Sequence, residues 1–154
     1  MKRRGRLAAV ARPIAFALRF QGEAVELDGG RFWVETRAGA AERCSRQLAG
    51  IGDGAAICRR QLELWDDGSL VQSGELDCGT GDSVTFRARG ALGASPDPHY
   101  RHGTAILEVT GGRGRLAGAR GYVTSNFLLA DDGDLTDHYL GLLFLEQPAK
   151  EEAQ

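Results

Sequence analysis

The sequence has few of the residues that mark several protein classes. It contains three cysteines, four prolines and one methionine in 154 residues, and Lys2 and Lys150 are its only lysines. The cysteines show no CxxC spacing, so neither a disulfide framework nor a metal site is predicted. The formal net charge of -2 provides no overall positive field to attract nucleic acid or an anionic membrane. We therefore expect no nucleic-acid partner and no cofactor.

The amino-terminal segment imitates a secretion signal. Basic residues from Met1 to Arg6 precede an apolar run from Leu7 to Leu18, which is the order of regions in a signal peptide. Arg12 and Pro13 interrupt the run, and no small-residue cleavage site follows. No stretch approaches the roughly 20 apolar residues that cross a bilayer, which predicts no membrane insertion. We predict a cytoplasmic protein.

Glycine is abundant, with 22 residues in the chain, about twice the usual share of roughly 7%. Turn signals rich in Gly and Asp separate stretches in which apolar and polar residues alternate, and this pattern is typical of short strands. The strands are predicted at residues 13–20, 31–37, 55–65, 70–76, 84–92, 104–109, 121–129 and 137–145. Residues 41–48 fit a short helix or a further strand. The pattern predicts an antiparallel sheet that closes on itself or forms a sandwich.

No linker divides the chain. We expect a flexible basic extension over residues 1–12, one β-barrel domain over residues 13–147 and a charged tail over residues 148–154. The longest irregular stretch, residues 93–103, fits a lid over an opening or a solvated loop.

A glycine-rich segment from Ile106 to Gly121 reads ILEVTGGRGRLAGARG. It resembles the T-G-G-x-G-x-[FL]-x-G-A-x-G signature shared by plant allene oxide cyclases, dirigent proteins and related bacterial barrels. Glycines in such a bend permit positive φ and close backbone approach. The segment lacks the Gly-Lys-Ser/Thr ending of a phosphate loop. The resemblance implies an all-β fold, a single antiparallel closed β-barrel of about eight strands of the calycin-like kind.

The resemblance extends upstream of this segment. Residues 52–58, GDGAAIC, are similar to the G-x-x-A-G-L-C stretch of the plant cyclases. From Cys58 to Gly90 the chain aligns with theirs without a gap, so the resemblance covers about residues 30–146.

The polar residues of the plant cyclase site are not retained. Those enzymes use a Glu and an Asn of the first strand, and residues 13–20 contain neither. Their second-strand pocket Asn corresponds to Val34 and their pocket Tyr to Leu92, while Cys58 and Phe32 keep a pocket residue type. The resemblance therefore implies a related pocket but not allene oxide cyclisation.

A barrel of this size holds one small ligand when its inward side chains leave room. We expect Cys58, Phe32, Phe86 and Leu92 to line the lumen with mostly apolar surface. Such a lumen suits a hydrophobic small molecule, such as a polyketide-, polyene- or terpenoid-like compound.

Polar candidates for the site follow from strand parity. Tyr122 or Asn126 would donate to a ligand carbonyl if their face of the strand points inward, and would be solvent-exposed otherwise. An inward Arg60 would bind a carboxylate, and its alternative is a surface or rim position. Glu108 fits a buried acid or an outward charge. His138 fits a catalytic or ligand-binding residue near the barrel mouth, or a structural one.

Two function classes follow. The first is a cofactor-free cyclase or isomerase in bacterial natural-product biosynthesis, which acts by orienting a reactive chain and excluding water. The second is a non-catalytic dirigent-like or lipocalin-like binder. The last strand is apolar on both faces, with Leu140, Leu142 and Phe144 on one of them. One face must pack on another surface, so we predict a homodimer or homotrimer.

Overall fold

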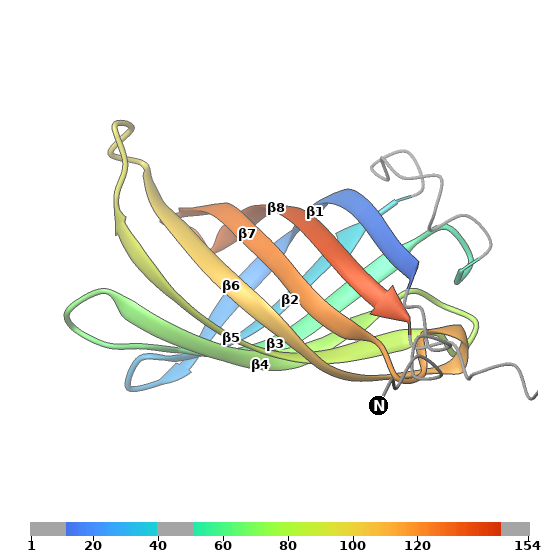
Figure 1. Cartoon of the computed structure of the whole chain (residues 1–154). Coiled ribbons are helices and arrows are strands. Elements are labelled where there is room, and N and C mark those ends of the chain that lie inside the picture. The colour runs from blue at the N-terminus through green and yellow to red at the C-terminus, as the bar shows by residue number, and fades with distance from the viewer. Residues whose placement is uncertain (1–11, 40–50, 146–154) are drawn as a thin grey trace, which may run out of the picture.

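The computed structural model describes residues 12–39 and 51–145, which form one closed barrel of eight antiparallel strands (Figure 1). Each strand pairs with its neighbours in the sequence, and the pairing of β1 with β8 closes the barrel. The strands are β1 (Arg12–Asp28), β2 (Arg31–Ala38), β3 (Ala56–Leu64), β4 (Ser69–Asp77), β5 (Ser83–Ala94), β6 (Tyr100–Arg113), β7 (Arg120–Ala130) and β8 (Asp134–Leu145). The predicted all-β closed barrel is confirmed.

Two elements differ from the sequence-based prediction. Strand β1 has 17 residues and runs well beyond the expected residues 13–20. The expected irregular stretch at residues 93–103 is mostly a hairpin, because Gly93 pairs with His102 and Ala94 with Arg101. These residues extend past the core and are exposed on both faces, so they show no alternation of apolar and polar residues. The segment predicted as a helix or strand at residues 41–48 lies outside the described residues.

The two ends of the barrel are built differently. The turns after β1, β3, β5 and β7 gather at one end, and the β5–β6 hairpin projects beyond the rest of the barrel wall there (Figure 1). At the opposite end lie the β4–β5 turn and the β6–β7 connection, which contains the short helix η3 (Gly114–Leu116). We call the first the hairpin end and the second the closed end. No helix in the described ranges has the length and apolar character needed to cross a membrane.

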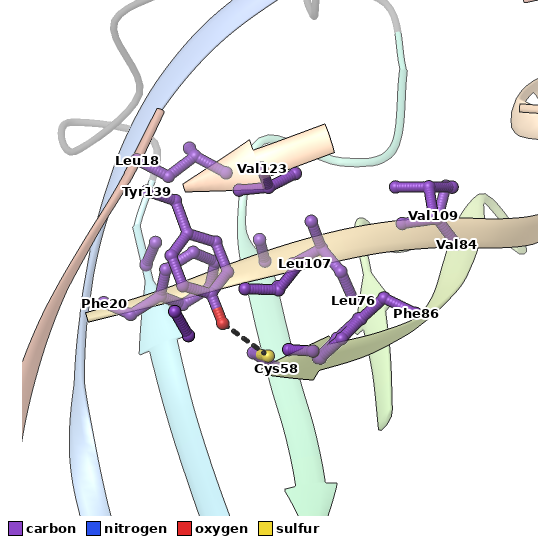
Figure 2. Packing of buried hydrophobic residues seen from close by; sticks show 14 of the residues in the cluster. Leu18, Phe20, Cys58, Leu76, Val84, Phe86, Leu107, Val109, Val123 and Tyr139 are labelled. Atoms are coloured by element: carbon purple, nitrogen blue, oxygen red, sulfur yellow. Dashed lines mark hydrogen bonds between the residues drawn. The ribbon is translucent and has the colours of Figure 1, made fainter. Parts of the chain in front are cut away.

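Inward side chains of all eight strands fill the middle of the barrel. Figure 2 shows Phe20 and Tyr139 packed together there, and their ring centroids lie 4.9 Å apart. Two inward glycines make room for rings on the neighbouring strands. A Cβ on Gly103 would lie 2.1 Å from the ring of Phe127, and one on Gly141 would lie 2.3 Å from the ring of Phe16. The lumen is therefore a packed core over most of its length.

One buried carboxylate ties the closed end together. Asp82, at 2% exposure, accepts hydrogen bonds from the backbone amides of Arg115 and Gly52, both at 2.8 Å. The Arg115 guanidinium also donates to it, with Nε at 2.9 Å. Three separate turns thus meet at one side chain. These donors, the backbone amides of Arg115 and Gly52 foremost, hold the pKa of Asp82 down to about 2.

The substitution Asp82→Asn should lower the melting temperature at neutral pH. The unfolded pKa of Asp is about 3.9, so the stabilisation from a folded pKa of about 2 is present above pH ~4 and disappears as the pH falls toward 2. Melting curves of the two proteins should therefore converge over that window. Asp131→Asn removes the same charge from an exposed turn and should leave the melting temperature unchanged. A constant gap between wild type and Asp82→Asn down to pH ~2 would contradict this account.

Candidate functional site

A depression opens at the hairpin end, with a volume of about 510 Å³. We call it the vestibule. It is lined by Glu26, Gly30, Phe32, Leu64, Trp65, Asp66, Gly68, Leu92 and Arg101. A volume of this size accommodates a small organic molecule.

An apolar pocket continues from the vestibule into the barrel, and we call it the neck. Phe32, Leu64 and Leu92 line both spaces. The other lining residues of the neck are Ala24, Val34, Arg60, Leu62, Phe127, Leu129 and Leu135. Its free space is only about 10 Å³, which is room for about one water molecule. A ligand in the vestibule can therefore send no more than a small group inward unless side chains move.

Arg60 is the polar residue among those that line the neck. Its side chain is 1% exposed, and its Nη2 donates to Asp137 Oδ2 at 2.9 Å. Its Nη1 donates to the Tyr139 hydroxyl, and the Ser125 hydroxyl donates to the other oxygen of Asp137 at 2.6 Å. The ion pair neutralises both charges inside the barrel, as burial requires. We call Arg60, Asp137, Tyr139, Ser125 and Cys58 the Arg60 cluster.

Cys58 joins the cluster through sulfur. Its Sγ lies 3.4 Å from the Tyr139 hydroxyl, the contact drawn as a dashed line in Figure 2, and 3.6 Å from Arg60 Nη1. Burial raises the pKa of the Cys58 thiol and raises that of the Tyr139 phenol well above its usual value. Burial also raises the pKa of Asp137, while Arg60 opposes that shift. Both Cys58 and Tyr139 are therefore neutral at physiological pH, and Cys58 is not an activated nucleophile.

Four buried polar atoms in the described ranges have no hydrogen-bond partner. They are Thr36 Oγ1, Arg60 Nε and both amide atoms of Gln72. Their side chains come from the three adjacent strands β2, β3 and β4 and face inward. Unpaired buried polar atoms are rare in folded proteins, and such atoms commonly bind a water molecule or a ligand.

Several predicted pocket residues do face the lumen. Val34, Phe32, Leu92 and Arg60 line the neck. Cys58 lies beside Arg60, and Phe86 is buried in the packed core. The structure therefore brings these side chains together from β2, β3 and β5 on the inner face of the barrel.

Four other predicted residues lie outside the lumen, which corrects the inward placement considered for Tyr122, Asn126 and Glu108 and the ligand-binding role considered for His138. Tyr122 is 59% exposed, and Asn126 and His138 are also exposed. Glu108 is half-buried and accepts a hydrogen bond from Arg87 Nε at 3.0 Å on the outer surface. The inward residues of β7 and β8 are the alternate ones, because side chains of a strand change face at every position. None of the four can contact a ligand in the neck.

Sequence reasoning missed Asp137, Tyr139, Ser125, Gln72 and Thr36. A signal for the first was present. Asp137 lies on the same face of β8 as Leu135, Tyr139 and Leu143. It is therefore the charged residue on a face whose other side chains point into the core. Such a charge needs a buried partner, and Arg60 holds the equivalent place in β3.

No protein-family model matches the sequence, and no curated protein matches it either. Among solved structures, a pterocarpan synthase dirigent protein is similar, with 14% sequence identity and a TM-score of 0.49 over 89% of this chain and 90% of that chain. The strand pairing of the present chain itself defines the class. It is a small eight-stranded meander barrel with a vestibule, an apolar neck and a buried ion pair at the inner end of that neck.

Proposed function

We propose that this protein binds an apolar small molecule in the vestibule, with one group of the ligand entering the neck. The observation that carries the proposal is the continuity of the two spaces through Phe32, Leu64 and Leu92. The neck has apolar walls with Arg60 at its inner end, which is the usual composition of a ligand pocket, while Glu26, Asp66 and Arg101 stand around the vestibule outside it. The packed middle of the lumen favours binding at the hairpin end over enclosure of a whole ligand.

A cofactor-free cyclase or isomerase acting on a polyketide-, polyene- or terpenoid-like intermediate of bacterial natural-product biosynthesis is the second candidate. Arg60 favours it, because Asp137 and Tyr139 hold its guanidinium in a fixed position away from water. A donor fixed in this way stabilises negative charge that develops on a carbonyl oxygen. Binding at the vestibule is a requirement of both candidates, so it is tested first.

Trp65 provides a direct readout of binding. It lines the vestibule, whereas Trp33, the other tryptophan in the chain, is on β2 and outside both spaces. In a Trp33→Phe background, we expect the neutral fluorophore N-phenyl-1-naphthylamine to quench Trp65 by energy transfer and to saturate. Linear quenching without saturation would count against a site in the vestibule.

A charge placed at the wall of the vestibule should weaken this binding. Leu64→Arg puts a cation against the apolar neck, and we expect a loss of affinity of about tenfold or more because the bound probe would desolvate that charge. Val71→Arg introduces the same residue on β4, where the exposed side chain faces away from the lumen, and should bind as wild type does. Equal affinity of the two variants would rule out the vestibule. Thermal melts show whether each variant is folded.

The predicted homodimer or homotrimer concerns a different surface. Leu140, Leu142 and Phe144 lie on the outer face of β8 and are 64%, 51% and 41% exposed. Tyr122 on β7 is paired with Leu142 and extends the same apolar area. Self-association through this face stays a prediction, as does the cytoplasmic location.

A further inference from the structure

Carboxylates surround the mouth of the vestibule. The turns that connect β3 to β4, β5 to β6 and β7 to β8, at residues 65–68, 95–99 and 131–133, contain no lysine or arginine. They do contain exposed aspartates, which are Asp66, Asp67, Asp97, Asp131 and Asp132. Charges of one sign around an opening attract ligands of the opposite sign. The hairpin end of the barrel therefore favours the approach of a cation.

Two carboxylates belong to the wall of the vestibule itself. Glu26 comes from β1 and Asp66 from the β3–β4 turn, and both line the space. Neither side chain has a hydrogen-bond or ion-pair partner among the described residues, whereas Asp28 nearby in the sequence is paired with Arg31. Trp65 precedes Asp66 and is 48% exposed. An organic ammonium group is attracted both to carboxylates and to the face of an indole ring.

Arg101 is the cationic residue among those that line the vestibule. An anionic ligand at Arg101 would share the same space of about 510 Å³ with Glu26 and Asp66. Such a volume is roughly 10 Å across, which is close to the distance over which physiological salt screens charges. All three wall charges therefore act on one ligand. Two carboxylates against one guanidinium favour a cation over an anion.

The neck gives an independent sign that the connected space takes up a ligand. Arg60 lines the neck, and the Nε atom of this buried side chain has no hydrogen-bond partner within the described part of the chain. Buried polar atoms of this kind commonly bind a water molecule or a ligand. The other walls of the neck are apolar, so a charge placed there would be costly. A cationic ligand would therefore point its uncharged end into the neck and keep its charge in the vestibule.

We propose that the ligand is an organic cation with an apolar body, and that Glu26 and Asp66 bind its ammonium group in the vestibule with Trp65 beside it. The proposal rests on the proposed function, because it assumes a ligand whose apolar end enters the neck. It assigns to the vestibule the selection of ligands by charge, and to the neck their selection by apolar contact.

Three probes with one ring system test the proposal, and equilibrium dialysis measures the affinity of each. The first is naphthylmethyl-trimethylammonium. The second is neopentylnaphthalene, in which carbon replaces the ammonium nitrogen, and the third is naphthylacetate. We expect wild type to bind the ammonium probe about five- to thirtyfold more tightly than the uncharged probe, the effect of two screened charge contacts and one cation–π contact. Naphthylacetate should bind most weakly, and added salt should narrow these differences.

The double variant Glu26→Gln with Asp66→Asn removes both wall charges and keeps the size of each side chain. It should lose most of the preference for the ammonium probe and leave the affinity for the uncharged probe unchanged. Glu63→Gln with Asp131→Asn is the matched control, because it removes two exposed carboxylates at the same end of the barrel but outside the vestibule. The control should keep most of the preference.

The outcomes separate this proposal from the proposed function. Equal affinities of wild type for the ammonium and uncharged probes would overturn recognition of a cation. A preference that survives removal of the wall charges, or that the control loses equally, would overturn contact with Glu26 and Asp66. Tightest binding of naphthylacetate, abolished by Arg101→Gln, would show selection of an anion instead. In each case, weaker binding of the uncharged probe by Leu64→Arg would still support the vestibule. Absence of binding, or binding insensitive to Leu64→Arg, would overturn both proposals.

Discussion

Replacing Asp137 with alanine should lower the free energy of unfolding by about 3–5 kcal/mol, the usual cost of breaking a buried ion pair from one side. The change leaves the Arg60 guanidinium at 1% exposure without its carboxylate partner. It also leaves the Ser125 hydroxyl without an acceptor. Urea denaturation monitored by circular dichroism measures the loss.

Removal of both charges should recover most of that stability. In Arg60→Met with Asp137→Leu, apolar side chains replace the pair, and such exchanges are often neutral or stabilising. Glu35→Ala is the matched control. It breaks a half-exposed ion pair in which Arg59 Nε lies 3.1 Å from Glu35 Oε1, and it should lower the free energy of unfolding by less than about 1 kcal/mol. If Asp137→Ala lowers the free energy of unfolding no more than Glu35→Ala does, the ion pair with Asp137 does not offset the cost of burying Arg60.

Phe127→Ala should cost about 3–5 kcal/mol and at the same time improve ligand binding. The ring of Phe127 lies against Gly103 and lines the neck, so its removal opens a cavity continuous with the vestibule. The fluorophore N-phenyl-1-naphthylamine should therefore raise the melting temperature of the variant more than that of wild type, since a ligand of the folded state stabilises it by mass action. Thermal melts at several probe concentrations measure the difference.

The control for this prediction is a second ring seated over a glycine. Phe16 lies against Gly141 in the half of the barrel away from the hairpin end. Phe16→Ala should be destabilised to a similar extent, but the probe should not rescue it better than wild type. Equal rescue of the two variants would show that the probe binds any core cavity and that Phe127 does not limit the depth of the neck.

The barrel itself is predictable because its signals are local. The turn Asp28-Gly29-Gly30 needs positive φ, which both glycines adopt. Within a strand such as β2, apolar and polar residues alternate from one position to the next, so the pattern is visible in a short stretch of sequence. The projecting part of the β5–β6 hairpin was missed. It is formed by strand pairing alone, and because it does not cover the core, its sequence shows no alternation of apolar and polar residues.

The site was harder to predict because it is assembled across the lumen. Arg60 and Asp137 come from β3 and β8, which are not hydrogen-bonded neighbours in the barrel. Strand parity identifies each as inward, but it does not indicate which inward side chains meet across the interior. Parity is also sensitive to a slip of one residue, which is why Tyr122 and Asn126 were candidates for the lumen. The unpaired state of Gln72 depends on packing around it that no local pattern reports.

The seam between β1 and β8 has a consequence for how the chain reaches its folded state. Arg12 pairs with Leu145 and Glu23 with Asp134, so the last ladder joins segments from opposite ends of the described chain. Contacts of such long separation slow folding. Until β8 arrives, β1 and β7 each present an open edge to other chains. Deletion of β8 should therefore yield a protein that polymerises through those edges, which makes closure of the barrel a safeguard during synthesis.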